Sequence, residues 1–267
     1  MIGLLIGLSA WTPPARHVQP RSCVHLSLAE SSPAFLTRED GKNGKLAKLL
    51  VERGVPHVEL PCIAFERLEG FESLREALAT GGQGCVVLTS PEAATVFLDA
   101  WKTAGEPAAP PLATVGAGTA AVLTGAGLDA GFVPSKATGK TLATELPAPD
   151  GEGGVLYPAS ALASGVVEGG LRARGMDVQR IDTYTTVAAT WSDDEMARAR
   201  DAAVVTFASP SAVRVWAERV GCSAVALCIG ETSAAEARSL GFGDVRCPDA
   251  PGVGSWADTI AEWYHEA

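Results

Sequence analysis

Hydroxyl side chains stand at the ends of two apolar runs and are the residues best suited to chemistry in this chain. One set lies in Leu88-Thr89-Ser90-Pro91 and the other in Phe207-Ala208-Ser209-Pro210. A serine before a proline typically starts a helix, because proline fits the first turn and the hydroxyl accepts a hydrogen bond from a free amide. Such free amides also attract anions. Both turns therefore predict helix caps that can bind anionic groups.

No pattern in the sequence indicates covalent catalysis, metal binding or nucleotide binding. The four histidines share no metal-ligand spacing, and the six cysteines include no CxxC pair. Neither a G-x-S-x-G turn nor a G-x-G-x-x-G loop occurs. We therefore expect no metal, no cofactor and no disulfide framework, and a chemistry that depends on positioning and electrostatics.

The composition argues against two classes of function. The formal net charge is −10, without a lysine or arginine block, whereas a nucleic-acid-binding protein normally presents a basic stripe. No apolar run reaches the roughly 18 residues of a membrane span. We predict no nucleic-acid partner and no membrane partner.

The amino-terminal residues differ from the rest of the chain. No Asp or Glu precedes Glu30, whereas Arg16, Arg21 and several serines are present. An acid-free leader that carries hydroxyl groups is typical of an organellar transit peptide. We predict that residues 1–32 are a transit peptide or disordered leader; the alternative is the ragged start of a cytoplasmic protein.

The elements that position these turns occur in two copies. Both turns continue as Ser-Pro-x-Ala, with an aromatic residue seven positions after the serine. Farther along, Gly116 precedes Thr119 as Gly230 precedes Ser233, at the same offset. Repetition of this kind indicates two similar structural units.

Short apolar runs alternate with helical patterns along the chain, which is typical of parallel sheets covered by helices on both faces. Helical patterns cover residues 44–53, 91–103, 161–174 and 255–264. The predicted strands are 34–37, 57–60, 85–89, 112–116, 130–133, 154–158, 178–182, 203–207, 225–229 and 244–246. Because so many strands do not suit one open sheet, we predict an α/β fold with two flavodoxin-like, doubly wound parallel-sheet domains.

Several motifs in this order resemble the uroporphyrinogen-III synthase family. They are Leu36-Thr37-Arg38, Leu88-Thr89-Ser90-Pro91, Val115-Gly116-x-x-Thr119-Ala120 and Asp182-Thr183-Tyr184-Thr185-Thr186. The plastid members are most similar, in Leu156-Tyr157-Pro158-Ala159-Ser160-Ala161 and Cys228-Ile229-Gly230-Glu231-Thr232. Each motif is common by itself, but their order and spacing over residues 34–264 are specific. Three positions depart from the family: Ser233 replaces a threonine, Ala208 replaces a hydroxyl residue, and Ser211 stands where other residues are frequent.

The resemblance implies how the two domains are connected. The extended segments 60–65 and 181–187 would form a two-stranded crossover, although periodicity alone leaves open whether they cross or stop. One domain would then comprise residues 33–64 plus 185–267, and the other residues 65–184. The resemblance further implies a monomer in the plastid stroma, with the cytoplasm as the alternative.

The resemblance also implies a reaction that needs no cofactor. The substrate would be hydroxymethylbilane, a linear chain of four pyrroles with many carboxylates. The family's enzymes are carbon–oxygen lyases that remove its terminal hydroxyl as water and close the ring with the last pyrrole inverted. A transient contact with hydroxymethylbilane synthase, which makes this substrate, is a further expectation.

For the site, the resemblance favours Tyr184 as the general acid or hydrogen-bond donor to the departing hydroxyl. A phenol can donate without being ionised. The residues expected to bind substrate carboxylates are Arg38, Thr89, Ser90, Thr119, Ser160, Ser209, Ser211, Thr232 and Ser233. Helix capping explains many of these hydroxyls equally well.

Two other functions remain open at this point. One is a non-catalytic bilobal protein that binds a small anion or tetrapyrrole, and the other is an interaction module for tetrapyrrole enzymes. The first predicts closure around a ligand without turnover, and the second predicts a stable partner complex.

Overall fold

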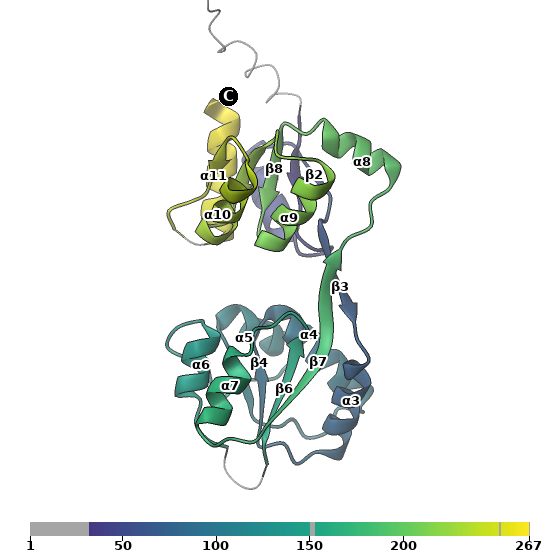
Figure 1. Ribbon diagram of the computed structural model, residues 1–267, viewed down its shortest axis with the longest axis vertical. Coiled ribbons are helices and arrows are strands. Elements are labelled where there is room, and N and C mark those ends of the chain that lie inside the picture. Colours follow the sequence, from purple (N-terminus) through teal and green to yellow (C-terminus); the bar gives the residue numbers. More distant parts are fainter. Residues whose placement is uncertain (1–31, 150–152, 251, 267) are drawn as a thin grey trace, which may run out of the picture.

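The computed structural model describes residues 32–149, 153–250 and 252–266. The predicted leader, residues 1–32, lies outside these ranges except for its last residue. Within the described ranges, no helix combines the length and apolarity required to cross a membrane. The chain folds into two α/β lobes, one above the other in Figure 1.

The first lobe contains a fully parallel sheet with the strand order β10-β9-β8-β1-β2. Its strands are β1 (Ala34–Leu36), β2 (His57–Glu59), β8 (Val204–Phe207), β9 (Val225–Cys228) and β10 (Val245–Arg246). Its helices are α2 (Gly44–Glu52), α8 (Asp193–Arg200), α9 (Pro210–Arg219), α10 (Glu231–Leu240) and α11 (Val253–Glu266). Numbered within the lobe, this is the flavodoxin-like order 2-1-3-4-5.

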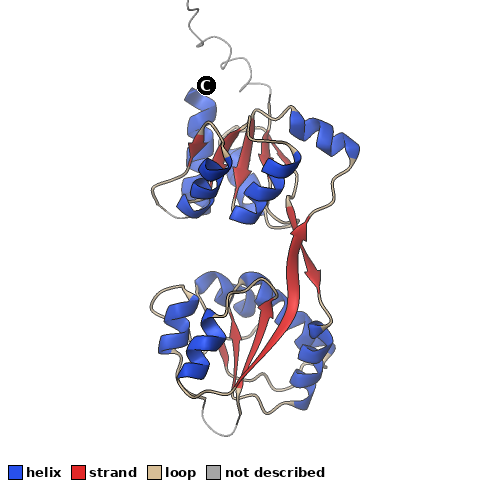
Figure 2. Cartoon of the chain, in the orientation of Figure 1, coloured by secondary structure: helices blue, strands red, loops and turns tan. Residues whose placement is uncertain are grey.

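The second lobe contains a sheet with the order β3-β7-β6-β4-β5, in which only β3 is antiparallel. Its strands are β3 (Ile63–Arg67), β4 (Cys85–Leu88), β5 (Leu112–Thr114), β6 (Val155–Ser160) and β7 (Val178–Ala188). Its helices are α3 (Gly70–Thr80), α4 (Pro91–Thr103), α5 (Ala117–Thr124), α6 (Gly139–Glu145) and α7 (Val166–Ala173). Helices cover both faces of each sheet (Figure 2), so the predicted α/β class is confirmed.

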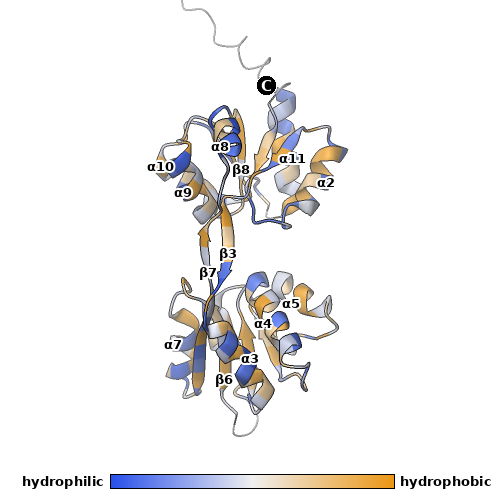
Figure 3. Ribbon diagram, turned by 90° about the vertical axis from the view of Figure 1, so that its right-hand side faces the viewer, coloured by the Kyte–Doolittle hydropathy of each residue, from blue (hydrophilic) through white to orange (hydrophobic). Residues whose placement is uncertain are grey.

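Hydrophobic burial follows the sheets, because each continuous apolar strand packs against helices on both sides. Buried clusters form around Trp216 and Trp256 in the first lobe, and around Phe97 and Tyr157 in the second. No cluster in the described part of the chain mixes the lobes, apart from Ile63 of β3, which joins the cluster of Trp216. Figure 3 shows hydrophobic residues along the strands of both lobes.

Three predicted elements differ from the structure. The strand expected at 130–133 is reduced to one isolated bridge between Ala113 and Phe132, because Gly131 and Pro134 bracket it and proline cannot donate to a ladder. The predicted strand 178–182 and the extended segment 181–187 are one continuous strand, β7. The helix expected at 161–174 begins only at Val166.

The strands β3 and β7 form an antiparallel ribbon between the lobes, as Figure 1 shows. Its register pairs Ile63 with Ala188 at one end and Arg67 with Tyr184 at the other. The ribbon therefore carries Tyr184 to the region where the lobes face each other.

Candidate functional site

Both Ser-Pro turns start helices, as predicted. The Ser90 hydroxyl accepts a 3.0 Å hydrogen bond from the amide of Ala93 at the start of α4. The Ser209 hydroxyl accepts the equivalent 3.3 Å bond from Ala212 at the start of α9. Each turn follows the carboxyl end of a parallel strand, which is the edge where doubly wound sheets bind their ligands.

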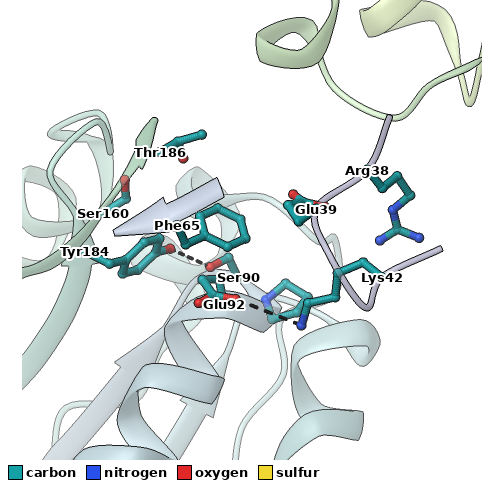
Figure 4. Close-up of a pocket in the computed structure, with 10 residues that line it drawn as sticks. Arg38, Glu39, Lys42, Phe65, Ser90, Glu92, Ser160, Tyr184 and Thr186 are labelled. Carbon is teal, nitrogen blue, oxygen red and sulfur yellow. Dashed lines mark hydrogen bonds and ion pairs between the residues drawn. The ribbon is translucent and has the colours of Figure 1, made fainter. Parts of the chain in front are cut away.

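A pocket of about 340 Å³ lies between the lobes. From the first lobe it is lined by the segment after β1, and from the second by the ends of β4 and β6 and by the ribbon. The lining residues are Arg38, Glu39, Lys42, Phe65, Ser90, Pro91, Glu92, Ser160, Tyr184 and Thr186. Figure 4 shows Arg38 and Lys42 on one side of it, with Ser90 and Tyr184 on the other.

Tyr184 has a fixed orientation in this pocket. Its hydroxyl forms a 2.8 Å hydrogen bond with the Ser90 hydroxyl, and its ring packs edge-on against Phe65 with the ring centres 5.8 Å apart. Burial raises the pKa of Tyr184 above its ordinary value, against the lowering effect of the Ser90 hydrogen bond. The phenol therefore keeps its proton at neutral pH and can serve as a hydrogen-bond donor.

Charged side chains of both signs face the same space. Arg38 has a buried Nε atom without a hydrogen-bond partner among the described residues, and a buried donor of this kind is unfavourable unless a partner pairs with it. Lys42 lies 4.0 Å from the Glu92 carboxylate across the pocket. Burial raises the pKa of Glu92, the charges of Glu39 and Asp99 add to this, and Lys42 counteracts it.

A second network holds the turn after β6 in place. Arg180 donates to the carbonyl oxygens of Ser160 and Ala163, at 3.2 Å each. The same guanidinium pairs with Glu168 and Asp182. These contacts fix Ser160 at the pocket wall.

Sequence comparison identifies the family. The family model for uroporphyrinogen-III synthase, HemD, matches residues 44–258. The chain belongs to the uroporphyrinogen-III synthase family. It is 41% identical to a rice protein (Oryza sativa subsp. japonica), "Uroporphyrinogen-III synthase, chloroplastic", over 251 residues, which cover 88% of this chain and 83% of the rice protein.

Solved structures with the same family name share the fold. The synthetase from Helicobacter pylori 26695 superposes with a TM-score of 0.61 at 15% identity, covering 86% of this chain and 99% of the other. A mutant synthase from the extremely thermophilic bacterium Thermus thermophilus gives a TM-score of 0.57 at 19% identity, covering 88% and 100%.

The pocket brings together four of the ten predicted site residues. These are Arg38, Ser90, Ser160 and Tyr184. Thr89 lies beside the pocket, half-buried, with its hydroxyl 3.4 Å from that of Tyr157.

The other five suggested residues lie at helix starts outside this pocket. Thr119 and Ser233 are both only 2% exposed. Ser209 and Ser211 are half-buried at the start of α9, and Thr232 is exposed in the first turn of α10.

Six pocket residues were not predicted as site residues: Glu39, Lys42, Phe65, Pro91, Glu92 and Thr186. Lys42 and Glu92 stand six and four residues after the last residues of β1 and β4. The carboxyl ends of the strands are the edge where doubly wound sheets bind ligands, so the edge could be expected from the sequence, but not which of its residues meet across the gap. Among the described residues, no group of three His, Cys, Asp or Glu side chains is arranged to hold a metal ion.

Proposed function

We propose that the protein is a uroporphyrinogen-III synthase that cyclises hydroxymethylbilane with loss of water and inversion of the last pyrrole. The observation that carries the proposal is family membership over most of the chain. A pocket between the lobes, lined by hydroxyl groups, a phenol and two cations, supports it. The enzyme is a carbon–oxygen lyase of tetrapyrrole biosynthesis.

In this proposal, Tyr184 donates a hydrogen bond to the departing hydroxyl group. Its bond to Ser90 and its contact with Phe65 orient the phenol before substrate binds, so little reorganisation is needed during the reaction. Arg38, with its unpartnered Nε, binds a substrate carboxylate. The pocket holds the reacting end of the bilane, since four substituted pyrroles exceed its volume.

The remaining substrate carboxylates bind at the helix starts that surround the gap. Thr89, Ser90, Thr119 and Ser160 serve this role in the second lobe, and Ser209, Ser211, Thr232 and Ser233 in the first. Free amides at helix starts carry partial positive charge, which compensates for the acidic net charge of the chain.

We further propose that the chain is a monomer and that it acts in the plastid stroma. The chloroplastic name of the rice relative supports this compartment. Residues 33–64 plus 185–267 act as one domain and residues 65–184 as the other, with the ribbon as the hinge. Transient contact with hydroxymethylbilane synthase would deliver the unstable substrate.

The test is to supply freshly made hydroxymethylbilane to the purified protein and to separate the type I and type III products. A synthase forms mostly the type III isomer, whereas unassisted closure gives the type I isomer. A protein that binds the bilane but leaves the type I isomer as the product would contradict the proposal and favour a non-catalytic tetrapyrrole-binding protein.

A further inference from the structure

Glu92 is an unexpected residue in this pocket. A site for a substrate with many carboxylates gains nothing in affinity from another carboxylate, since like charges repel. Yet the Glu92 side chain is only 17% exposed and lines the pocket together with Ser90 and Tyr184. Figure 4 shows its carboxylate on the same wall as the Ser90 hydroxyl.

Helix capping does not account for this carboxylate. Acidic residues are favourable in the first turn of any helix, and Glu92 occupies the first turn of α4. However, the equivalent position in the repeated turn of the first lobe is Ser211, and α9 has no acidic residue in its first turn. The same Ser-Pro turn therefore forms without an acid at this position, so the turn itself does not require Glu92.

We propose that Glu92 is a further catalytic residue: the general acid that protonates the departing hydroxyl and then, as a carboxylate, faces the cation left behind. This inference rests on the proposed function and adds a proton donor to it. Tyr184 then orients the hydroxyl by a hydrogen bond and keeps its own proton.

The step balances in protons and charge. The carbon–oxygen bond of the hydroxymethyl group breaks with both electrons leaving on oxygen, which takes the Glu92 proton and departs as water. The positive charge stays on the terminal azafulvenium group, next to the new carboxylate. The substituted α carbon of the last pyrrole attacks this cation and forms a spiro intermediate, and the bond from that carbon to its original bridging methylene then breaks, which moves the positive charge to the methylene of the neighbouring pyrrole. The unsubstituted α carbon of the inverted pyrrole attacks that methylene, and the proton it loses returns to Glu92.

The surroundings of Glu92 fit an acid that gains its proton when substrate arrives. Burial is the main cause of its raised pKa, Glu39 and Asp99 act in the same direction, and Lys42 and Arg67 oppose them. Lys42 lies at 4.0 Å, the limit of an ion pair. A substrate carboxylate would draw Lys42 away, so the pKa of Glu92 would rise further in the complex.

The test compares Glu92→Gln with wild type in type III formation from hydroxymethylbilane. Removing the acid should lower kcat about 100-fold or more, whereas KM should stay constant or fall because a negative charge is lost. Wild-type kcat should fall as pH rises through the Glu92 pKa in the complex, and this limb should be absent in Glu92→Gln. Tyr184 cannot cause such a limb near neutral pH, because burial raises its pKa above the ordinary value of a phenol.

Two further variants isolate the effect. Glu92→Asp keeps an acid and should recover part of kcat. Glu72→Gln removes an exposed first-turn carboxylate from α3 in the same lobe, outside the pocket lining, and should behave as wild type. A folded Glu92→Gln protein with kcat within twofold of wild type would overturn the inference. Failure of wild type to form type III product would instead overturn the proposed function.

Discussion

At the scale of single residues, the two tyrosines near the pocket differ in what their hydroxyls can reach. Tyr157 is 1% exposed and its hydroxyl lies 3.4 Å from that of Thr89. Tyr184 lies at the pocket wall, and its hydroxyl has a short bond to Ser90. Burial raises the pKa of both phenols, so both stay protonated at neutral pH. Only Tyr184 has its hydroxyl at a position from which it could donate a hydrogen bond to a substrate hydroxyl.

Tyr184→Phe should therefore fold normally and lose type III formation. The ring and its contact with Phe65 remain, while the hydrogen-bond donor is removed. We expect kcat for type III product to fall about 100-fold, with type I product accumulating from unassisted closure. Tyr157→Phe is the matched control and should keep near-wild-type kcat. Undiminished type III formation by Tyr184→Phe would remove the phenol from the mechanism.

At the scale of elements, the two Ser-Pro turns allow capping and catalysis to be separated. Each serine caps a helix in the same way, but only Ser90 also bonds a pocket phenol. Ser209 is therefore an internal control, because it shows how much a helix cap contributes to stability without a bond to a pocket phenol.

Ser90→Ala and Ser209→Ala should each lower the free energy of unfolding by about 1 kcal/mol, the usual loss for a helix cap. Urea unfolding would measure this. Type III kcat should fall more in Ser90→Ala, because Tyr184 loses its orienting partner there. Equal kcat values in the two variants would mean that the Ser90–Tyr184 bond has no part in the reaction.

Elements with strong local signals could be predicted from the sequence, and those set by tertiary contacts could not. The strands β4 and β8 and the helices that follow them were recognisable from the repeated turns. The segment 161–165 looked helical, yet the Leu162 amide bonds the Ser160 hydroxyl and Arg180 holds the Ala163 carbonyl. The first contact lies within the turn after β6 and the second comes from β7. The helical periodicity of the sequence therefore could not reveal them.

The same limit applies to the site. Tyr184, Arg38, Ser90 and Ser160 were expected from family motifs, and all four line the pocket. Lys42 and Glu92 belong to no motif. They meet only because the segment after β1 faces the start of α4 across the gap, and local sequence carries no information about which loops of two lobes face each other.

At the scale of the whole molecule, the two sheets have the same spatial arrangement of strands, but the chain passes through the strands in a permuted order. The strands β10-β9-β8-β1-β2 correspond in space to the bridge at Phe132 followed by β5-β4-β6-β7. Carboxyl ends of strands from both sheets line the pocket. Of the ion pairs in the described residues, only that of Lys42 with Glu92 joins the lobes.

Because the buried clusters are almost entirely separate, the lobes should unfold as two cooperative units. Trp216 is 0% exposed in the first lobe and packs edge-on against Phe35 and Phe207. Trp216→Ala should cost its lobe about 3–5 kcal/mol and shift one calorimetric transition. Phe97→Ala, at a 0% exposed position in the second lobe, should shift the other.

Calorimetry of the two variants also tests the proposed division into residues 33–64 plus 185–267 and residues 65–184. Independent units violate two-state unfolding, so each variant should leave one transition at its wild-type temperature. A tetrapyrrole product that contacts both lobes should raise both transitions, because binding stabilises every unit that forms the site. A single calorimetric transition that shifts in both variants would contradict this division. The ribbon would then couple the two lobes rigidly, and it could not act as the hinge that admits the substrate.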